Sequence, residues 1–269
     1  MHPVLFRIGS FEVGTYGLLL MLGFFAALWL AQRLGRKDGL PSEAISDLSI
    51  TVLIAGVVGS KLLMVIVDLF QGASFNQVFS LATLRAGGAV HGGIILGTAA
   101  FFWRMKKWKL SLPHTLDALV PAVALGEGIG RLGCLAAGCC YGSECHQPWA
   151  IIFTNPEAQF FSGTPLHMPL HPVQFYTFLV ELLLMGILLI LHRRRNFPGQ
   201  VAGAFFMLEG LGRMTLEFWR GDLDRGFILG IPWLSTGRLT GLLFILFGLG
   251  LWVRFRSRKP PVKTAEGRP

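Results

Sequence analysis

The chain of 269 residues is 52% hydrophobic and only 14% charged, whereas soluble domains carry about 25% charged residues. Its mean hydropathy is +0.57. These values exclude an ordinary soluble domain and indicate an integral membrane protein. The net charge of +9 does not indicate nucleic-acid binding, because the basic residues are distributed as a membrane-topology signal.

Seven segments are apolar and long enough to be membrane helices, since a bilayer core about 30 Å thick requires about 20 apolar residues per helix. No small-residue cleavage site follows the first segment, so we expect a retained helix and not a signal peptide. The sequence therefore predicts an all-α integral membrane protein with seven transmembrane helices in a single domain, residues 1–258. The segments are residues 15–33, 48–70, 89–104, 115–137, 174–192, 201–219 and 236–254.

The basic residues predict the orientation of these helices. Of the 24 Lys and Arg residues, 16 follow the first, third, fifth and seventh segments, and four lie in the loops on the opposite side. Since cytoplasmic loops are enriched in Lys and Arg, we expect the N-terminus outside and the C-terminus in the cytoplasm. The longest loop, residues 138–173, is then extracytoplasmic, and its prolines predict a small cap of turns and short strands. Residues 259–269 have the composition of a disordered cytoplasmic tail.

Charged residues inside apolar segments mark a candidate site, because a charge at membrane depth costs about 2.5–3.5 kcal/mol on insertion scales. Glu209, Arg213 and Glu217 are four residues apart and therefore share one helix face. They form either an ion-pair ladder between helices or an arginine held in place to bind an anion, a role that suits its planar guanidinium. A second arginine at membrane depth, Arg131, favours an anionic ligand such as a phospholipid head group.

Glycines surround two of the candidate residues. Arg131 lies in GIGRLG, where Gly130 and Gly133 allow a backbone or a ligand to come close. His91 lies in GGAVHGG and is either a histidine hydrogen-bonded within the bundle or a general base, since histidine titrates near neutral pH. Tyr16 is either a residue of the interfacial aromatic belt or an active-site hydroxyl.

The four cysteines lie within twelve residues, at positions Cys134, Cys139, Cys140 and Cys145. Their spacing does not match a common zinc motif, so we expect no metal, and zinc bound by the four cysteines is an alternative. An extracytoplasmic loop lies in an oxidising compartment, which favours a structural disulfide of Cys139 or Cys140 with Cys145, and Cys134 is then a small buried apolar residue. A redox-active thiol pair is the alternative.

Five stretches together resemble the bacterial prolipoprotein diacylglyceryl transferase family, and the resemblance covers residues 1 to about 255. The stretches are YGLLLMLGF from Tyr16, GGAVHGG around His91, GRLGCLAAGCCYG from Gly130, HPVQFYTFLVE from His171 and GRMTLEFWRGD from Gly212. Each motif is weak alone, but the five occur in the family's order on segments of the expected topology.

The resemblance implies a reaction at the outer leaflet of the bacterial cytoplasmic (inner) membrane. The diacylglyceryl group of phosphatidylglycerol moves to the lipobox cysteine thiol of a preprolipoprotein, and glycerol 1-phosphate leaves, as the first step of lipoprotein maturation. The acceptor thiol must become a thiolate, and the leaving phosphate needs hydrogen-bond donors. The partners are therefore a phospholipid and a signal peptide in the membrane, with no nucleic acid, no cofactor and no metal.

The resemblance assigns phosphate binding to the stretch GRLGCLAAGCCYG from Gly130, the family signature, which contains Arg131. Arg131 matches the arginine that holds the lipid phosphate, with Gly130, Gly133 and Cys134 beside it. Arg213 matches the arginine that stabilises the leaving phosphate.

The remaining roles are assigned in the same way. Glu217 matches the glutamate that orients the second arginine, His91 the histidine proposed as the base, and Tyr16 the first-helix tyrosine near the substrate. His171 and Gln174 match residues that order the outer cap.

The chain departs from the family signature at Cys134, where asparagine is usual, and at Cys139, where an acidic residue is usual. The loss of asparagine removes a hydrogen-bonding group beside Arg131. Two rival functions follow from the same residues: a membrane thiol–disulfide oxidoreductase that uses the cysteines, and a transporter for an anionic solute. The sequence contains no evident internal repeat to support the transporter.

Overall fold

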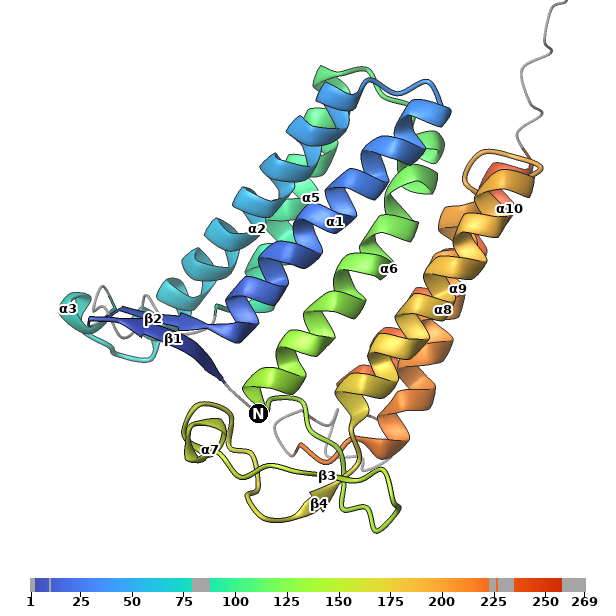
Figure 1. Cartoon of the computed structure of the whole chain (residues 1–269). Helices are drawn as coiled ribbons and strands as arrows, with labels where there is room; N and C mark the ends of the chain where they lie inside the picture. The colour runs from blue at the N-terminus through green and yellow to red at the C-terminus, as the bar shows by residue number, and fades with distance from the viewer. Residues whose placement is uncertain (1–2, 10, 79–87, 223–225, 227–234, 258–269) are drawn as a thin grey trace, which may run out of the picture. The chain divides into compact units, whose positions relative to one another are not determined.

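The computed structural model describes residues 3–9, 11–78, 88–222, 226 and 235–257 (Figure 1). Each of the seven predicted segments coincides with a long helix in this part of the chain and ends within a few residues of it. The short elements between them are α3 (Phe75–Val78), α7 (Pro156–Ser162) and a 3-10 turn, η1 (Glu217–Trp219). The long helices are α1 (Thr15–Lys37), α2 (Ser42–Phe70), α5 (Val90–Lys107), α6 (Leu112–Ala137), α8 (Val173–Arg194), α9 (Gln200–Leu216) and α10 (Thr236–Arg256).

Five of these helices are long and apolar enough to cross a membrane: α1, α2, α6, α8 and α10. The other two are less apolar or shorter, because α5 ends in three basic residues and α9 has only 17 residues. The prediction of an integral membrane protein built from helices is therefore confirmed. The prediction of seven membrane spans extends to α5 and α9 and stays a prediction.

Two short β-hairpins accompany the helices. At the N-terminus, β1 (Val4–Ile8) pairs antiparallel with β2 (Phe11–Gly14), a hairpin that the sequence did not predict. In the loop after α6, β3 (Ile151–Ile152) pairs with β4 (Pro169–Leu170), and α7 begins at a proline behind an Asn155 cap. The predicted cap of turns and short strands is present, with one additional short helix. The predicted disordered tail, residues 259–269, lies outside the described residues.

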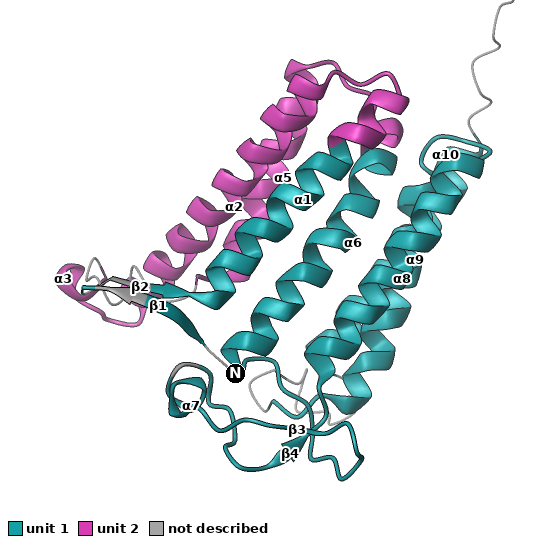
Figure 2. Ribbon diagram, viewed as in Figure 1, with its two compact units in different colours: residues 1–31, 116–269 teal, residues 32–115 magenta. Residues whose placement is uncertain are grey.

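The chain divides into two compact units (Figure 2). Residues 32–115 form one unit, in which α2 and α5 pack with their backbones in contact. A Cβ atom added at Gly59 would overlap the carbonyl of Gly92, and one added at Gly92 would overlap the carbonyl of Gly59. Glycine is therefore required at both positions for this close approach, as in many membrane helix pairs.

Residues 1–31 and 116–269 form the other unit, which is built around α6, α8, α9 and α10. Its core combines small and branched side chains of three of these helices, among them Ala124, Leu188 and Val201. Helices α9 and α10 also meet at glycines, because a Cβ at Gly210 would overlap the carbonyl of Gly241. This packing fixes the ends of the helices that carry the candidate site.

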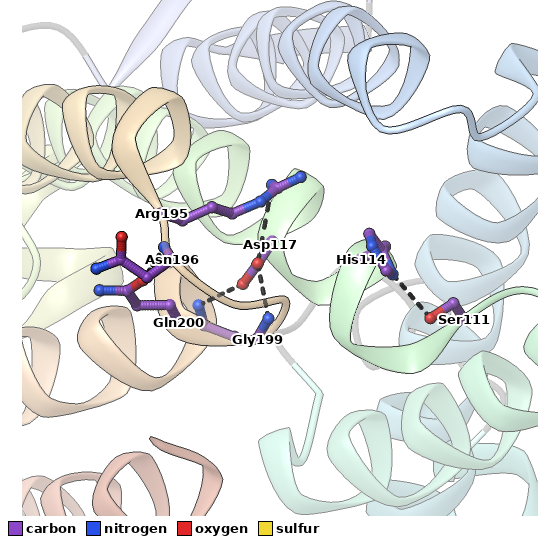
Figure 3. Close-up of polar contacts among 8 residues, drawn as sticks. Ser111, His114, Asp117, Arg195, Asn196, Gly199 and Gln200 are labelled. Carbon is purple, nitrogen blue, oxygen red and sulfur yellow. Dashed lines mark hydrogen bonds and ion pairs between the residues drawn. The ribbon is translucent and has the colours of Figure 1, made fainter. Parts of the chain in front are cut away.

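A buried aspartate caps one end of this unit (Figure 3). Asp117, in the first turns of α6, accepts hydrogen bonds from the backbone N–H groups of Gly199 at 2.8 Å and Ala202 at 2.9 Å. The guanidinium of Arg195 lies 3.8 Å from the same carboxylate. Since the first N–H groups of a helix lack intrahelical partners, Asp117 satisfies the start of α9 and joins it to α6.

Candidate functional site

A polar cavity of about 170 Å³ lies where α6 and α9 end and α8 and α10 begin. Three arginines line it: Arg131 from α6, Arg213 from α9 and Arg220 from the turn after η1. The cap strands β3 and β4 lie at the same end of this unit (Figure 1). Three guanidinium groups in one small cavity can bind a phosphate through several charge-assisted hydrogen bonds.

Three carboxylates meet beside these arginines, and two of them form ion pairs with Arg131 and Arg213. Glu127 of α6, Glu181 of α8 and Glu209 of α9 bring carboxylate oxygens within 4.8 Å of one another. The Arg131 Nη2 atom lies 3.0 Å from Glu127 Oε1, and the Arg213 Nη1 atom lies 3.8 Å from Glu209 Oε1. The carboxylates therefore neutralise part of the arginine charge inside the apolar segments and join three helices.

Of the two interpretations of the sixth predicted segment, the structure shows part of the ion-pair ladder, and anion binding stays a prediction. Glu209 and Arg213 make one step of the ion-pair ladder, and both line the cavity. Glu217 lies at the start of η1 and is buried. Its carboxylate lies directly against Gly237 of α10, where a Cβ atom would collide with it. The side chain of Arg213 is 36% exposed, so a ligand in the cavity can reach it.

Sequence reasoning did not single out Arg220 as part of this site, and it noted Glu181 only as a charge at membrane depth, without a role. Arg220 donates from Nε to Asp222 Oδ1 at 2.8 Å and makes a second contact with Asp222 from Nη2. The sequence signal that could have identified Arg220 is its position in GRMTLEFWRGD, the stretch that also contains the family-matched Arg213 and Glu217. Glu181 ends the HPVQFYTFLVE stretch, and its Oε2 atom is buried without a hydrogen-bond partner among the described residues.

The glycines of the signature serve helix packing. A Cβ atom at Gly133 would lie 3.1 Å from the ring of Tyr16, and one at Gly130 would lie 3.9 Å from Leu20. Gly133 thus allows α1 to pack closely against α6 and places Tyr16, which is 42% exposed, beside the signature, whereas a side chain at position 130 would meet Leu20 at an ordinary contact distance. Among the described residues, the lining of the cavity includes Arg131 but not Tyr16, Gly130, Gly133 or Cys134.

All four cysteines lie in the described part of the chain, and all are free thiols. The structure does not form the expected disulfide of Cys139 or Cys140 with Cys145, which is buried and donates its backbone N–H to Pro169. Instead, Cys134, Cys139 and Cys140 bring their sulfur atoms within 4.8 Å of one another. Cys140 also lines the cavity.

Two predicted residues connect α8 to the loop around it. Gln174 is buried, lines the cavity and donates from Nε2 to the carbonyl of Cys139 at 2.8 Å. The Nδ1 atom of His171 lies 3.2 Å from the hydroxyl of Tyr176, and its backbone N–H donates to Ser143. These contacts agree with an ordering role. His91 belongs to the other unit, where it is the second residue of α5 and is exposed.

An apolar groove of about 630 Å³ adjoins the polar cavity. It runs along α8 and α9, and Val180, Gly212 and Leu216 line both spaces. Its other walls are mainly aliphatic or aromatic, from Trp149 in the cap to Ile187 in the middle of α8. A charged cavity joined to an apolar groove fits a ligand with an anionic head and hydrocarbon chains.

Comparison with known proteins identifies relatives over nearly the whole chain. The sequence model of the prolipoprotein diacylglyceryl transferase family matches residues 3–254. The phosphatidylglycerol–prolipoprotein diacylglyceryl transferase of Clostridium tetani is 34% identical over 259 residues, which cover 96% of this chain and 100% of the relative. Proteins with the same name from Acinetobacter baumannii and Stenotrophomonas maltophilia are 31% and 30% identical over 96% and 97% of the chain and 94% of each relative.

Proposed function

Because the chain belongs to the prolipoprotein diacylglyceryl transferase family, we propose that its cavity and groove carry out the transfer of diacylglyceryl from phosphatidylglycerol to a prolipoprotein cysteine. The chain is a transferase of lipoprotein biosynthesis, and it catalyses the first step of lipoprotein maturation. One observation carries the assignment to this place in the molecule. The three-arginine cavity shares Val180, Gly212 and Leu216 with the apolar groove, so one lipid can fill both.

The reaction exchanges one bond at a glyceryl carbon. The thiolate of the acceptor cysteine attacks this carbon and forms a thioether, while the bond from the carbon to the phosphate oxygen breaks. The electron pair goes to that oxygen, and glycerol 1-phosphate leaves. Negative charge therefore moves from sulfur to phosphate in the transition state, and preorganised donors at the phosphate lower the barrier.

The three arginines supply these donors. Arg131 is held by Glu127 at 3.0 Å and binds the lipid phosphate from the α6 side of the cavity. Arg213 pairs with the carboxylate of Glu209 at 3.8 Å and lines the cavity, where it stabilises the leaving phosphate. Arg220, fixed by Asp222, adds a third positive charge. Glu217, buried against Gly237, orients the chain around Arg213.

The acceptor side of the reaction is assigned to His91 and Tyr16. His91, exposed near the start of α5, is the residue that the family resemblance assigns as the general base for the acceptor thiol. Tyr16 is exposed beside Gly133 and provides a hydroxyl to the incoming peptide. The acceptor is a signal peptide with a lipobox cysteine.

The orientation proposed from the sequence places the cavity at the outer leaflet of the cytoplasmic membrane. Within the unit that holds the cavity, α8 and α10 begin at the cavity and end in Arg193 and Arg194 and in Arg254 and Arg256. Basic residues at the far ends support a cytoplasmic location for those ends. The cavity and the cap then face outward, with α5 and α9 as the two further spans.

Replacement of Arg131 tests the assignment. The purified chain, in mixed micelles with phosphatidylglycerol labelled in its acyl chains, is assayed for label on a lipobox peptide. Arg131→Ala should abolish transfer, because the phosphate loses its α6 donor. Since this variant also leaves Glu127 without its ion pair, the double variant Arg131→Gln with Glu127→Gln keeps the charge balance and should be equally inactive.

The matched control is Arg193→Ala, at the exposed end of α8, which should retain full transfer. Full activity of both Arg131 variants would show that the cavity is not the phosphate site. A chain that transfers no label in any form, wild type included, would refute the proposed activity itself.

A further inference from the structure

The proposed transfer leaves a cluster of three thiols beside the cavity without a role. We propose that Cys134, Cys139 and Cys140 form a binding site for a thiophilic metal cation, either Cu(I) or Zn(II). The turn after α6 brings these three residues together, so the site does not need the spacing of a common zinc motif.

The sulfur positions fit one metal ion. A Zn–S bond is about 2.3 Å long, so three sulfurs around one zinc lie about 3.8 Å apart. The three sulfurs here are within 4.8 Å of one another, so side-chain shifts of about 1 Å or less would complete the geometry. Thiolate ligands select Cu(I) and Zn(II) over harder cations. The cluster therefore matches this class in both ligand type and distance.

The backbone holds the three residues in this arrangement. Helix α6 ends at Ala137, Gly138 takes a left-handed φ of 88°, and its N–H donates to the carbonyl of Cys134 at 2.9 Å. Cys140 has a positive φ of 57°, an uncommon conformation for a residue other than glycine. The amide of Gln174 fixes the carbonyl of Cys139 at 2.8 Å, so the turn is tied to both α6 and α8.

A metal ion binds these cysteines as deprotonated thiolates, so the charge of the site matters. Arg220 and Arg131 line the same cavity as Cys140. Three thiolates with Zn(II) carry a net charge of −1, and with Cu(I) a net charge of −2. The same two arginines offset this charge at the edge of the cavity.

The donor set separates the two metals. Three sulfurs complete a trigonal site for Cu(I), whereas Zn(II) prefers four ligands and would take a water molecule in the open position. Cys140 lines the cavity, so water can reach that position. X-ray absorption should therefore show three sulfur neighbours for bound copper, and three sulfurs with one oxygen for bound zinc.

Metal binding is measured on the full chain in detergent, without oxygen and after reduction. Zn(II) or Cu(I) is supplied through a chelator of known affinity, and the bound metal is counted by mass spectrometry after gel filtration. Wild type should retain one equivalent of at least one of the two ions. Cys139→Ser, Cys140→Ser and Cys134→Asn should each weaken binding at least tenfold.

Cys145→Ser is the matched control, because Cys145 is buried outside the cluster, and it should keep wild-type binding. The proposal is overturned if reduced wild type retains neither ion, if none of the three cluster variants weakens binding, or if Cys145→Ser weakens it as much as they do. The readout is bound metal, so a failure here leaves the transfer assay and its conclusions untouched.

Discussion

Replacing Arg213 by lysine keeps the positive charge of the cavity and removes the planar fork of the guanidinium. A lysine point charge still attracts the phosphate, but it cannot make two parallel hydrogen bonds. A hydrogen bond to a charged group contributes about 1.5–3 kcal/mol, and about 1.4 kcal/mol corresponds to a tenfold change in rate. The loss of one such bond should therefore lower kcat/KM about 10- to 100-fold.

The way this loss divides between kcat and KM tests the assigned role. Charge on the leaving phosphate oxygen develops in the transition state, so kcat should fall more than KM rises. Initial rates are measured over a range of phosphatidylglycerol concentrations for wild type, Arg213→Lys and Arg213→Ala, with Arg193→Lys as a charge-preserving control on exposed surface. The thermal midpoint in detergent should be similar for wild type and Arg213→Lys.

Two results would refute the reasoning. If Arg213→Lys has a kcat/KM within twofold of wild type, the guanidinium fork does not contact the leaving group. If the loss lies entirely in KM and kcat is unchanged, Arg213 binds the ground state of the lipid and does not act on the developing charge.

Three further predictions concern the groove and the helix packing. Leu183→Trp, at a groove position that is 66% exposed, should narrow the groove and raise KM for long-chain phosphatidylglycerol more than for a short-chain analogue. Asp117→Ala removes two charge-assisted bonds to the start of α9. It should cost about 3 kcal/mol of stability, measured as a thermal midpoint lowered by roughly 6–12 °C. Gly92→Ala should greatly reduce the yield of folded protein, measured by gel filtration, because the added methyl group would overlap the carbonyl of Gly59.

Each of these three predictions can be contradicted by a stated result, and two of them have a matched control variant. Leu243→Trp, at a position that is 54% exposed on α10 and outside the groove, should leave the chain-length preference unchanged. An equal effect of both tryptophans would show that the groove does not bind the acyl chains. An Asp117→Ala midpoint equal to that of wild type would show that the cap contributes little. Gly186→Ala, which meets no atom within 4 Å, should fold normally, and an equally good yield of Gly92→Ala would contradict the close α2–α5 packing.

The helices were predictable from the sequence because each consists of a long apolar run. The segment predicted at 174–192 and the helix Val173–Arg194 differ by only one or two residues at each end. The N-terminal hairpin was not predictable in this way. Its two strands of five and four residues are too short to produce a clear alternation of apolar and polar residues.

The arginines of the candidate site were partly predictable, since a charge in an apolar segment stands out. Arg131 and Arg213 were found in this way, and the structure brings them to one cavity. Arg220 escaped notice because it lies beyond the apolar run, where a charge is ordinary. Glu181 is the only acidic residue of its segment. Its proximity to Glu127 and Glu209 could not be predicted, because these residues come from two other helices.

The grouping of the cysteines could not be obtained from their spacing. The expected pair joined Cys139 or Cys140 to Cys145, whereas the structure places Cys134 with Cys139 and Cys140. The turn that groups them contains two residues with positive φ, Gly138 and Cys140. Backbone angles of this kind cannot be deduced from the spacing of the cysteines.

If the groove and the cavity bind the lipid as proposed, the wall that they share determines how the substrate arrives. Pulling one acyl chain of about 16 carbons into water would cost on the order of 12 kcal/mol, at about 0.8 kcal/mol per methylene. A lipid that enters along Leu183 and Ile187 keeps its chains in hydrocarbon throughout and moves only its head past Val180 and Leu216. Substrate capture then takes place by two-dimensional diffusion in the leaflet. The two products separate by solubility, since the thioether-linked lipid stays in the bilayer and the glycerol phosphate dissolves in water.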